Sequence, residues 1–156
     1  KLIINPIILT IMKAKRLLIG LVLAVMPIVT MADGKLSNKP LPETISTFLT
    51  THFADIKVAF HKEKNRLSDE RYNIHLMNGI DIEMDRNGNW TEIDGHKNAL
   101  PSSVIPEKIQ KFISENYPNQ TVFSLDRKDR GRIEVKLSNG WELLFDKNFQ
   151  LINIDD

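Results

Sequence analysis

Cysteine is absent from the chain, which has 156 residues. This absence excludes disulfides, thiolate zinc sites, a cysteine nucleophile and a lipid-modified cysteine. The core must therefore stabilise the fold without covalent cross-links. The apolar fraction of 42% and the charged fraction of 26% are those of a globular protein, and the length suits one ordinary domain.

Acidic residues are absent from residues 1–32, whereas this leader contains four basic residues, Lys1, Lys13, Lys15 and Arg16. The remaining chain has 17 basic and 20 acidic residues, a net charge of −3, so the formal charge of +1 comes from the leader. A nucleic-acid partner or an anionic membrane surface is therefore not expected.

A long apolar run is also missing. Residues 17–29 are apolar except for Gly20 and Pro27, which is short of the roughly 20 residues that span a bilayer. This run follows the basic residues 12–16 and precedes small residues at 30–32, so it predicts a signal peptide over residues 1–32 with cleavage after Ala32. The mature protein is expected to be periplasmic or secreted, without membrane insertion. The natural start would be Met12, which leaves open whether residues 1–11 are translated in vivo.

The mature part contains an internal repeat. Residues 41–53 align with residues 105–117, and residues 72–85 align with residues 133–146. The offset falls from 64 to 61 between the two blocks, so the first copy has three more residues in a loop that we interpret as a surface hairpin. We predict an N-terminal tail over residues 33–40, repeat 1 over 41–95, a linker over 96–104 and repeat 2 over 105–156.

Each copy opens with a helical pattern. Apolar residues recur at i, i+3, i+4 and i+8, which gives a helix one apolar face, and a proline suits its first turn. The residues are Pro42, Ile45, Phe48, Leu49 and Phe53 in the first copy and Pro106, Ile109, Phe112, Ile113 and Tyr117 in the second.

The rest of each copy predicts antiparallel strands. Apolar and polar residues alternate over residues 72–77 and 133–138, and each run ends in an Asn-Gly pair that predicts a two-residue hairpin. Further strands are expected near residues 56–61, 89–93, 121–126 and 149–154. The fold class is therefore α+β: each copy has one helix and about four strands, and both copies share one sheet of about eight strands with the helices on one face.

These motifs resemble the PepSY-like periplasmic proteins, whose fold is similar to that of the secreted β-lactamase inhibitory protein. The resemblance rests on the helix pattern L-P-x-x-I-x-x-F-L, the Asn-Gly hairpin and a second copy opening with I-P-x-x-I, and it covers residues 41–156. It implies a concave antiparallel sheet with helices behind it, and a peptidase-inhibitory or regulatory role. The chain lacks the inhibitory protein's cysteines, so the resemblance does not extend to β-lactamase inhibition.

The outward positions of the central strands are the candidate binding residues. They lie on the face that the helices leave open, although a sheet face that simply contacts water explains them almost as well. They are Asn73, His75, Asp81, Glu83, Glu134, Lys136, Glu142 and Leu144.

No catalytic residue, cofactor site or metal site is predicted. Residues 85–89 resemble the start of a calcium loop, but His96 stands where a loop of this kind needs glutamate, and a tight turn explains the pattern better. The four histidines lack metal-site spacing and are expected to contact solvent. No nucleophile elbow or local triad signature is present, so an enzyme is not expected.

The sequence thus predicts an exported, non-enzymatic binding module. It would inhibit or regulate a hydrolase or peptidase through the open sheet face, with a periplasmic or extracellular protein or peptide as partner. A small-ligand or divalent-cation binding protein and a structural envelope component remain alternatives. The oligomeric state is left open.

Overall fold

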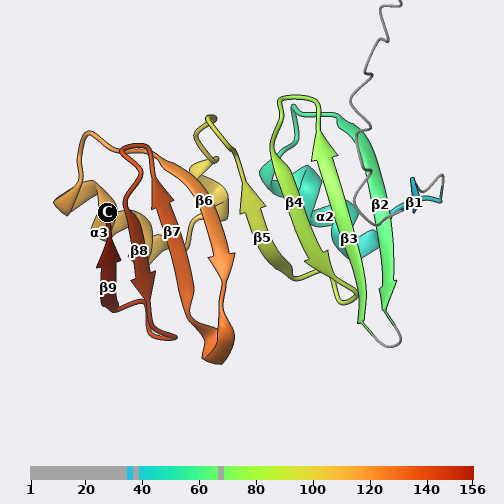
Figure 1. The fold of residues 1–156 in the computed structure, drawn as a ribbon. Helices are drawn as coiled ribbons and strands as arrows, with labels where there is room; N and C mark the ends of the chain where they lie inside the picture. Colours follow the sequence, from blue (N-terminus) through green and yellow to red (C-terminus); the bar gives the residue numbers. More distant parts are fainter. Residues whose placement is uncertain (1–34, 37–38, 67–68) are drawn as a thin grey trace, which may run out of the picture. The chain divides into compact units, whose positions relative to one another are not determined.

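The computed structural model describes residues 35–36, 39–66 and 69–156, all within one compact unit, Ala32–Asp156. The predicted signal peptide, residues 1–32, lies outside the described residues. Two α-helices and nine strands make up this unit (Figure 1).

The helices are α2, Glu43–His52, and α3, Glu107–Asn116. Each begins directly after a proline, Pro42 or Pro106, whose fixed φ suits a helix start and whose missing N–H costs no hydrogen bond there. Their apolar faces are buried as the periodicity predicts, with Ile45 and Leu49 on α2 and Ile109 and Ile113 on α3.

All nine strands belong to one sheet, in which each strand pairs antiparallel with the next one along the chain. Hairpins join most of these neighbours directly, whereas α2 lies between β1 and β2, and α3 lies between β5 and β6. The strands are β1 (Lys35–Leu36), β2 (Val58–Arg66), β3 (Asp69–Leu76), β4 (Asp81–Asp85), β5 (Trp90–Asp94), β6 (Val122–Arg127), β7 (Ile133–Leu137), β8 (Glu142–Phe145) and β9 (Leu151–Asp155).

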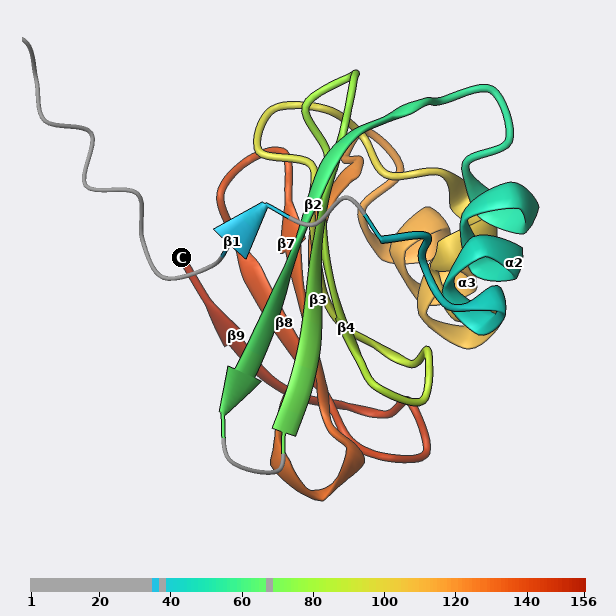
Figure 2. The same cartoon turned by 90° about the vertical axis from the view of Figure 1, so that its right-hand side faces the viewer.

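Both helices lie on the same side of the sheet, and the other side carries no helix among the described residues (Figure 2). Buried residues alternate along the strands, as in Ile82 and Met84 on β4 or Leu143 and Phe145 on β8, and they face the helices. The predicted α+β class with a single antiparallel sheet is confirmed. Nine strands are present rather than about eight, because the short β1 pairs with β2.

The Asn-Gly hairpins have a different turn from the predicted one. The two-residue type I′ turn that Asn-Gly favours needs positive φ at both central residues, but of the Asn78-Gly79 pair only Gly79 has it, at +87°. Leu76 N donates to Ile80 O at 2.9 Å, and Gly79 N donates to Leu76 O at 2.9 Å. The loop therefore has three residues, with a type I turn followed by a left-handed residue. The second Asn-Gly turn, with Gly140 at +94°, has the same bonds.

The three extra residues of the first copy lengthen a hairpin. β2 and β3 have nine and eight residues, whereas β6 and β7 have six and five. The pairing of β2 with β3 continues to Arg66 and Asp69. The insertion thus lies where a surface hairpin was predicted.

The two halves of the sheet meet where β5 pairs with β6. The predicted linker, residues 96–104, returns the chain over the helix side and ends in a 3₁₀ turn at Ser102–Val104. The linker contributes Leu100 and Val104 to the core. Leu100 N donates to Val122 O at 2.8 Å, which fixes the linker to the start of β6.

Candidate functional site

The open sheet face carries all eight candidate binding residues. Their strands alternate buried and less buried residues, and each candidate occupies a position that points away from the core. Cross-strand register pairs Asn73 with Glu83, His75 with Asp81, Glu134 with Leu144, and Lys136 with Glu142. Because paired residues of an antiparallel sheet point to the same side, the eight form two groups, one in each half of the sheet.

The structure adds a third group between them, which the sequence analysis missed. At the junction of the halves, β5 and β6 pair Glu92 with Asp126 and Asp94 with Ser124. Glu92 and Asp94 also pair with Glu83 and Asp81 on β4. The open face is therefore continuous across the sheet, and its centre is acidic.

A shallow depression of about 130 Å³ lies over β3, β4 and β5 on this face. Six of its lining residues are polar, and four of these are carboxylates. They are Asn73, His75, Asp81, Glu83, Glu92 and Asp94.

Two histidines surround Asp81 at the edge of the depression. His75 Nδ1 contacts one carboxylate oxygen of Asp81, and His96 Nε2 lies 3.1 Å from the other. The other ring nitrogen of His96 lies 3.0 Å from Asp94 Oδ2. His96 adopts a φ of +55° at the end of β5, where its backbone N–H donates to Asp94 Oδ1 at 2.7 Å. These contacts fix two carboxylates and two imidazoles in one network.

Carboxylates crowd around Glu92. Partial desolvation and the neighbouring charges of Glu83, Asp126 and Asp94 raise the pKa of Glu92 above its usual value. The Glu92 carboxylate has no hydrogen bond or ion pair with any residue that the structure describes. The centre of the face thus holds negative charge that the described part of the chain does not fully compensate.

The basic residues of the face are paired. Lys128 contacts Asp126 and lies 2.9 Å from Glu134, and hydrogen bonds to these two carboxylates raise the pKa of Lys128. Lys136 lies 2.9 Å from Glu142, and this hydrogen bond raises the pKa of Lys136. Lys136 neutralises charge in the second half of the face, whereas Lys128 pairs with Asp126 of the central group and partly offsets the rise in the pKa of Glu92.

The turn at Asp85 uses its carboxylate internally. Asp85 Oδ1 accepts the backbone N–H groups of Asn87 and Asn89 at 2.8 and 2.9 Å, and Oδ2 accepts the Asn89 amide at 3.1 Å. Desolvation is the largest single contribution and raises the pKa of Asp85, but the hydrogen bonds from Asn89 and Asn87 together outweigh it, so the pKa lies below its usual value. The geometry favours the tight turn over a calcium loop, because both oxygens already have donors.

The prediction that all four histidines contact solvent is correct for the exposed His96 but not for His61. His61 is buried at 9% exposure, and its Nε2 has no hydrogen-bond partner among the described residues, so the prediction that it contacts solvent is wrong. No group of three or more His, Asp or Glu side chains in the described part of the chain is placed to hold a metal ion.

Comparison with known proteins identifies relatives across most of the described chain. Residues 70–153, more than half of the sequence, match the family described as "Putative beta-lactamase-inhibitor-like, PepSY-like". A "putative periplasmic protein" from Bacteroides vulgatus is 39% identical, with a TM-score of 0.73, and the match covers 81% of this chain and 99% of that one. No curated protein matches the chain.

Two further solved structures are similar. A "putative calcium-regulated periplasmic protein" from Bacteroides thetaiotaomicron is 38% identical with a TM-score of 0.73, covering 80% of this chain and 98% of that one. A "putative periplasmic protein of unknown function" from Bacteroides vulgatus is 28% identical with a TM-score of 0.71, covering 80% of this chain and 100% of that one.

The relatives agree with the location predicted from the sequence. All three structures are described as periplasmic, and no helix among the described residues is long and apolar enough to cross a membrane. The chain is a periplasmic or secreted protein. Because residues 70–153 match the family and a relative is 39% identical over nearly its whole length, the chain belongs to the PepSY-like, beta-lactamase-inhibitor-like family.

Proposed function

We propose that the chain is a non-catalytic binding module that holds a protein or peptide against its open sheet face. The observation that carries this proposal is the crowding of carboxylates around Glu92, whose pKa is raised by partial desolvation and by Glu83, Asp126 and Asp94. A face that merely contacts water gains nothing from placing like charges on adjacent strands, because directly opposed like charges destabilise a sheet.

A cationic segment would relieve this repulsion. A Lys or Arg side chain placed over the depression would contact Asp81, Glu83 and Glu92 together, and the network of His75 and His96 keeps Asp81 in position for it. Complementary charge of this kind mainly accelerates association and selects the partner. The preferred partner is therefore a basic segment of a periplasmic or extracellular protein.

The family description supports an inhibitory or regulatory role. The matched family is described as beta-lactamase-inhibitor-like, and none of the three related structures is described by a catalytic activity. We propose a hydrolase or peptidase as the partner, with the open face covering part of its surface. The chain itself would carry no catalytic residue.

The test compares two charge-matched triple variants as baits in envelope extracts. The first, Glu83→Gln, Glu92→Gln and Asp126→Asn, removes three charges from the centre of the open face. The control, Glu43→Gln, Glu107→Gln and Glu115→Gln, removes three charges from exposed positions on the helices. Partners are identified by cross-linking and mass spectrometry at low and high salt.

We expect the first variant to lose a partner that the wild type and the control retain, and high salt to weaken recovery in the same way. Equal recovery of every partner by both triple variants would remove the open face from the proposal. Circular dichroism checks that each variant is folded, which we expect because all six substitutions are at surface positions.

The second candidate function is binding of a divalent cation on the same face. A relative 38% identical to the chain is described as calcium-regulated, and four carboxylates line the depression. No three of these described carboxylates are placed around one point, so a bound cation would have to draw their side chains together. A cation that binds the folded state raises the melting temperature. Calcium at millimolar concentration should then stabilise the wild type and not the Glu83, Glu92 and Asp126 variant, whereas an unchanged melting temperature excludes this candidate.

We also infer that the two halves derive from one repeated unit. The aligned residues 41–53 and 105–117 include all of α2 and α3, and each helix precedes four strands. The central acidic group lies between the units, where β5 meets β6. The proposed binding surface would thus require both units, because its central acidic group forms only where β5 of one unit pairs with β6 of the other.

A further inference from the structure

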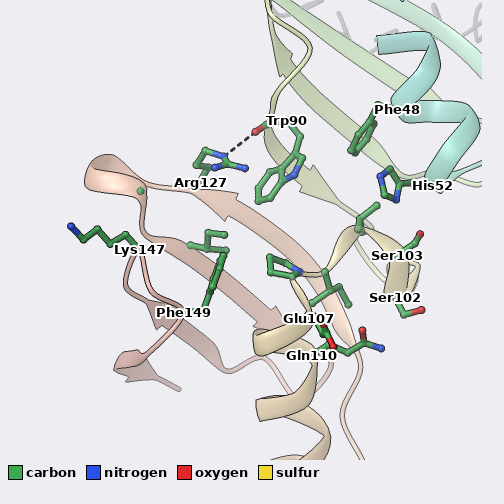
Figure 3. A pocket seen from close by; sticks show the side chains of 15 residues that line it. Phe48, His52, Trp90, Ser102, Ser103, Glu107, Gln110, Arg127, Lys147 and Phe149 are labelled. Carbon is green, nitrogen blue, oxygen red and sulfur yellow. Dashed lines mark hydrogen bonds between the residues drawn. The ribbon is translucent and has the colours of Figure 1, made fainter. Parts of the chain in front are cut away.

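A groove of about 770 Å³ lies on the helix side, at the junction of the two halves (Figure 3). It is formed by α2, β5, the 3₁₀ turn at Ser102–Val104, the start of α3, β6 and the turn between β8 and β9. Its volume is in the range of pockets that hold small molecules, about 300–1,000 Å³. The open sheet face and this groove are separate surfaces, because the lining residues are different.

Aromatic side chains line the groove from three separate elements. Phe48 comes from α2, Trp90 begins β5, and Phe149 belongs to the turn between β8 and β9 (Figure 3). All three are partly buried and pack against the core. This aromatic lining suits an apolar group, and it forms only when the three elements pack together.

Phe149 has an unfavourable backbone conformation that the related turns avoid. Four hairpin turns of five residues share one hydrogen-bond pattern. The N–H of the first residue donates to the carbonyl of the fifth, the N–H of the fourth donates to the carbonyl of the first, and the fourth residue has a positive φ. In three of them this residue is glycine: Gly79, Gly88 and Gly140, with φ of +87°, +84° and +94°. In the fourth it is Phe149, with φ of +65°. A left-handed conformation costs a residue with a Cβ about 1–2 kcal/mol, so the Phe149 side chain is present at a cost that glycine would remove.

Two cations lie at the end of the groove nearest the β6–β7 hairpin. The Arg127 guanidinium stacks 4.3 Å from the centre of the Trp90 ring, and its Nε donates to Trp90 O at 3.2 Å. This arrangement orients the guanidinium and leaves its terminal N–H groups available. Lys147 also lines the groove, although its ammonium extends away from Phe149 (Figure 3).

Neither cation has an ion-pair partner within the described residues, in contrast to Lys128 and Lys136. The groove has one carboxylate in its lining, Glu107, which belongs to the first turn of α3, where the helix dipole favours a negative charge. The Arg127 guanidinium therefore has no carboxylate partner among the described residues. In contrast, the backbone hydrogen bond from Gln150 and, to a smaller extent, the charge of Lys147 lower the pKa of Asp146, which is adjacent to Lys147, and the charge of Glu107 is stabilised by the helix dipole.

We propose that the groove binds a small organic carboxylate with an apolar body. The apolar body lies between Phe48, Trp90 and Phe149. The carboxylate pairs with Arg127, and Lys147 joins this contact when its side chain turns toward the groove. Charge complementarity selects an anion over a neutral or cationic molecule of the same shape. This site is independent of any partner on the open sheet face.

Fluorescence of Trp90 provides the assay. The chain has two tryptophans, so Trp141→Phe leaves Trp90 as the single reporter. Sodium decanoate, decanol and decyltrimethylammonium are the probes, since they share a ten-carbon chain and differ in charge; each is titrated below its micelle concentration. We expect a saturable change in Trp90 emission with decanoate and at least tenfold weaker binding of the other two.

Two variants in the same background separate the charge from the apolar contact. Arg127→Gln with Lys147→Gln should weaken decanoate binding at least tenfold, whereas the control Arg86→Gln with Lys97→Gln, at exposed positions of the first half, should leave it unchanged. Phe149→Gly should weaken binding at least fivefold without lowering the melting temperature, because the relieved backbone offsets the lost contact. Weaker binding with retained stability is the result that a purely structural role of Phe149 would not give.

The proposal is overturned by any of three results. These are no saturable change in Trp90 emission with decanoate, equal affinity for decanoate and decanol, or unchanged decanoate affinity in the Arg127 and Lys147 variant. If Arg127→Gln alters the position of Trp90, Lys147→Gln alone must still reduce the affinity for decanoate, measured by calorimetry.

Discussion

Gly95 lies where the two halves of the sheet join, and Gly95→Ala is expected to destabilise this junction. Gly95 N donates to Phe123 O at 2.8 Å, and Asn98 N donates to Gly95 O at 2.7 Å, so the residue is bonded on both sides. A Cβ at Gly95 would overlap the carbonyl oxygen of Asn98 and lie 3.1 Å from Phe123 O. Two of the three nearest atoms are backbone atoms, which cannot rotate away.

The expected cost is about 3 kcal/mol, the upper part of the range for overpacking a close-packed site. Gly140→Ala is the matched control: no heavy atom lies within 4 Å of its Cβ, but its φ of +94° is unfavourable for alanine. The control should therefore lose only about 1–2 kcal/mol, from the backbone conformation. The difference between the two variants measures the steric contact at the junction.

Urea unfolding followed by circular dichroism gives both free energies of unfolding, and an unchanged m-value shows that the transitions are comparable. Hydrogen exchange should show faster exchange for the amides of β5 and β6 in Gly95→Ala and not in Gly140→Ala. If Gly95→Ala loses no more stability than Gly140→Ala, the close contact with Asn98 does not exist in solution. The continuity of the open face across the junction would then lack its structural basis.

Three other substitutions test separate parts of the structure by urea unfolding. Glu92→Gln should raise the free energy of unfolding at pH 7 by about 0.5 kcal/mol. Because folding raises the pKa of Glu92, the ionised carboxylate destabilises the folded state, and the gain from glutamine should shrink as the pH falls through that pKa and Glu92 becomes protonated. Asp85→Ala should cost about 1 kcal/mol at pH 7 through its lost turn hydrogen bonds. Because folding lowers the pKa of Asp85, the wild-type advantage should be present above the usual pKa of an aspartate and be lost as the pH falls through the lowered pKa. Ile109→Ala, at a fully buried position on α3, should cost about 3 kcal/mol, and the exposed Gln110→Ala should not. A pH-independent Glu92→Gln or Asp85→Ala effect, or equal costs at residues 109 and 110, would contradict these assignments.

Periodicity predicted the elements well because each one buries a single face against one core. Ile45 and Leu49, or Ile109 and Ile113, recur at helical spacing because α2 and α3 each pack one side onto the sheet. Strand alternation likewise placed all eight candidate residues on the open face. Local patterns are sufficient when the burial of a residue depends only on its own element.

Turn chemistry was predicted less well, because two turn types share the same residues. Asn-Gly is typical of a two-residue turn, but it also fits a three-residue loop in which only the glycine is left-handed. The structure has the second form at Gly79 and Gly140. A pattern of residue types does not distinguish them, since the choice depends on the register of the flanking strands.

Both candidate sites depend on the junction between the halves, where sequence patterns carry little information. Glu92 and Asp126 are 34 positions apart in the sequence and become neighbours only when β5 pairs with β6. The groove likewise combines Trp90 with Arg127 and Phe149. A repeat shows which residues are common to both copies, whereas neighbours across a junction are determined by how the copies pack.

Phe149 illustrates how the difference between copies can point to function. The equivalent turn of the first half has Gly88, and a Cβ there would lie 2.6 Å from Thr44 Oγ1, so glycine is required by close packing as well as by its φ. The second half has room for a side chain at this position, and that side chain lines the groove. Since turn geometry favours glycine at both positions, packing of the fold alone explains Gly88 but not Phe149. The unequal residue at equivalent turns is therefore stronger evidence for a ligand site than any residue that the two halves share.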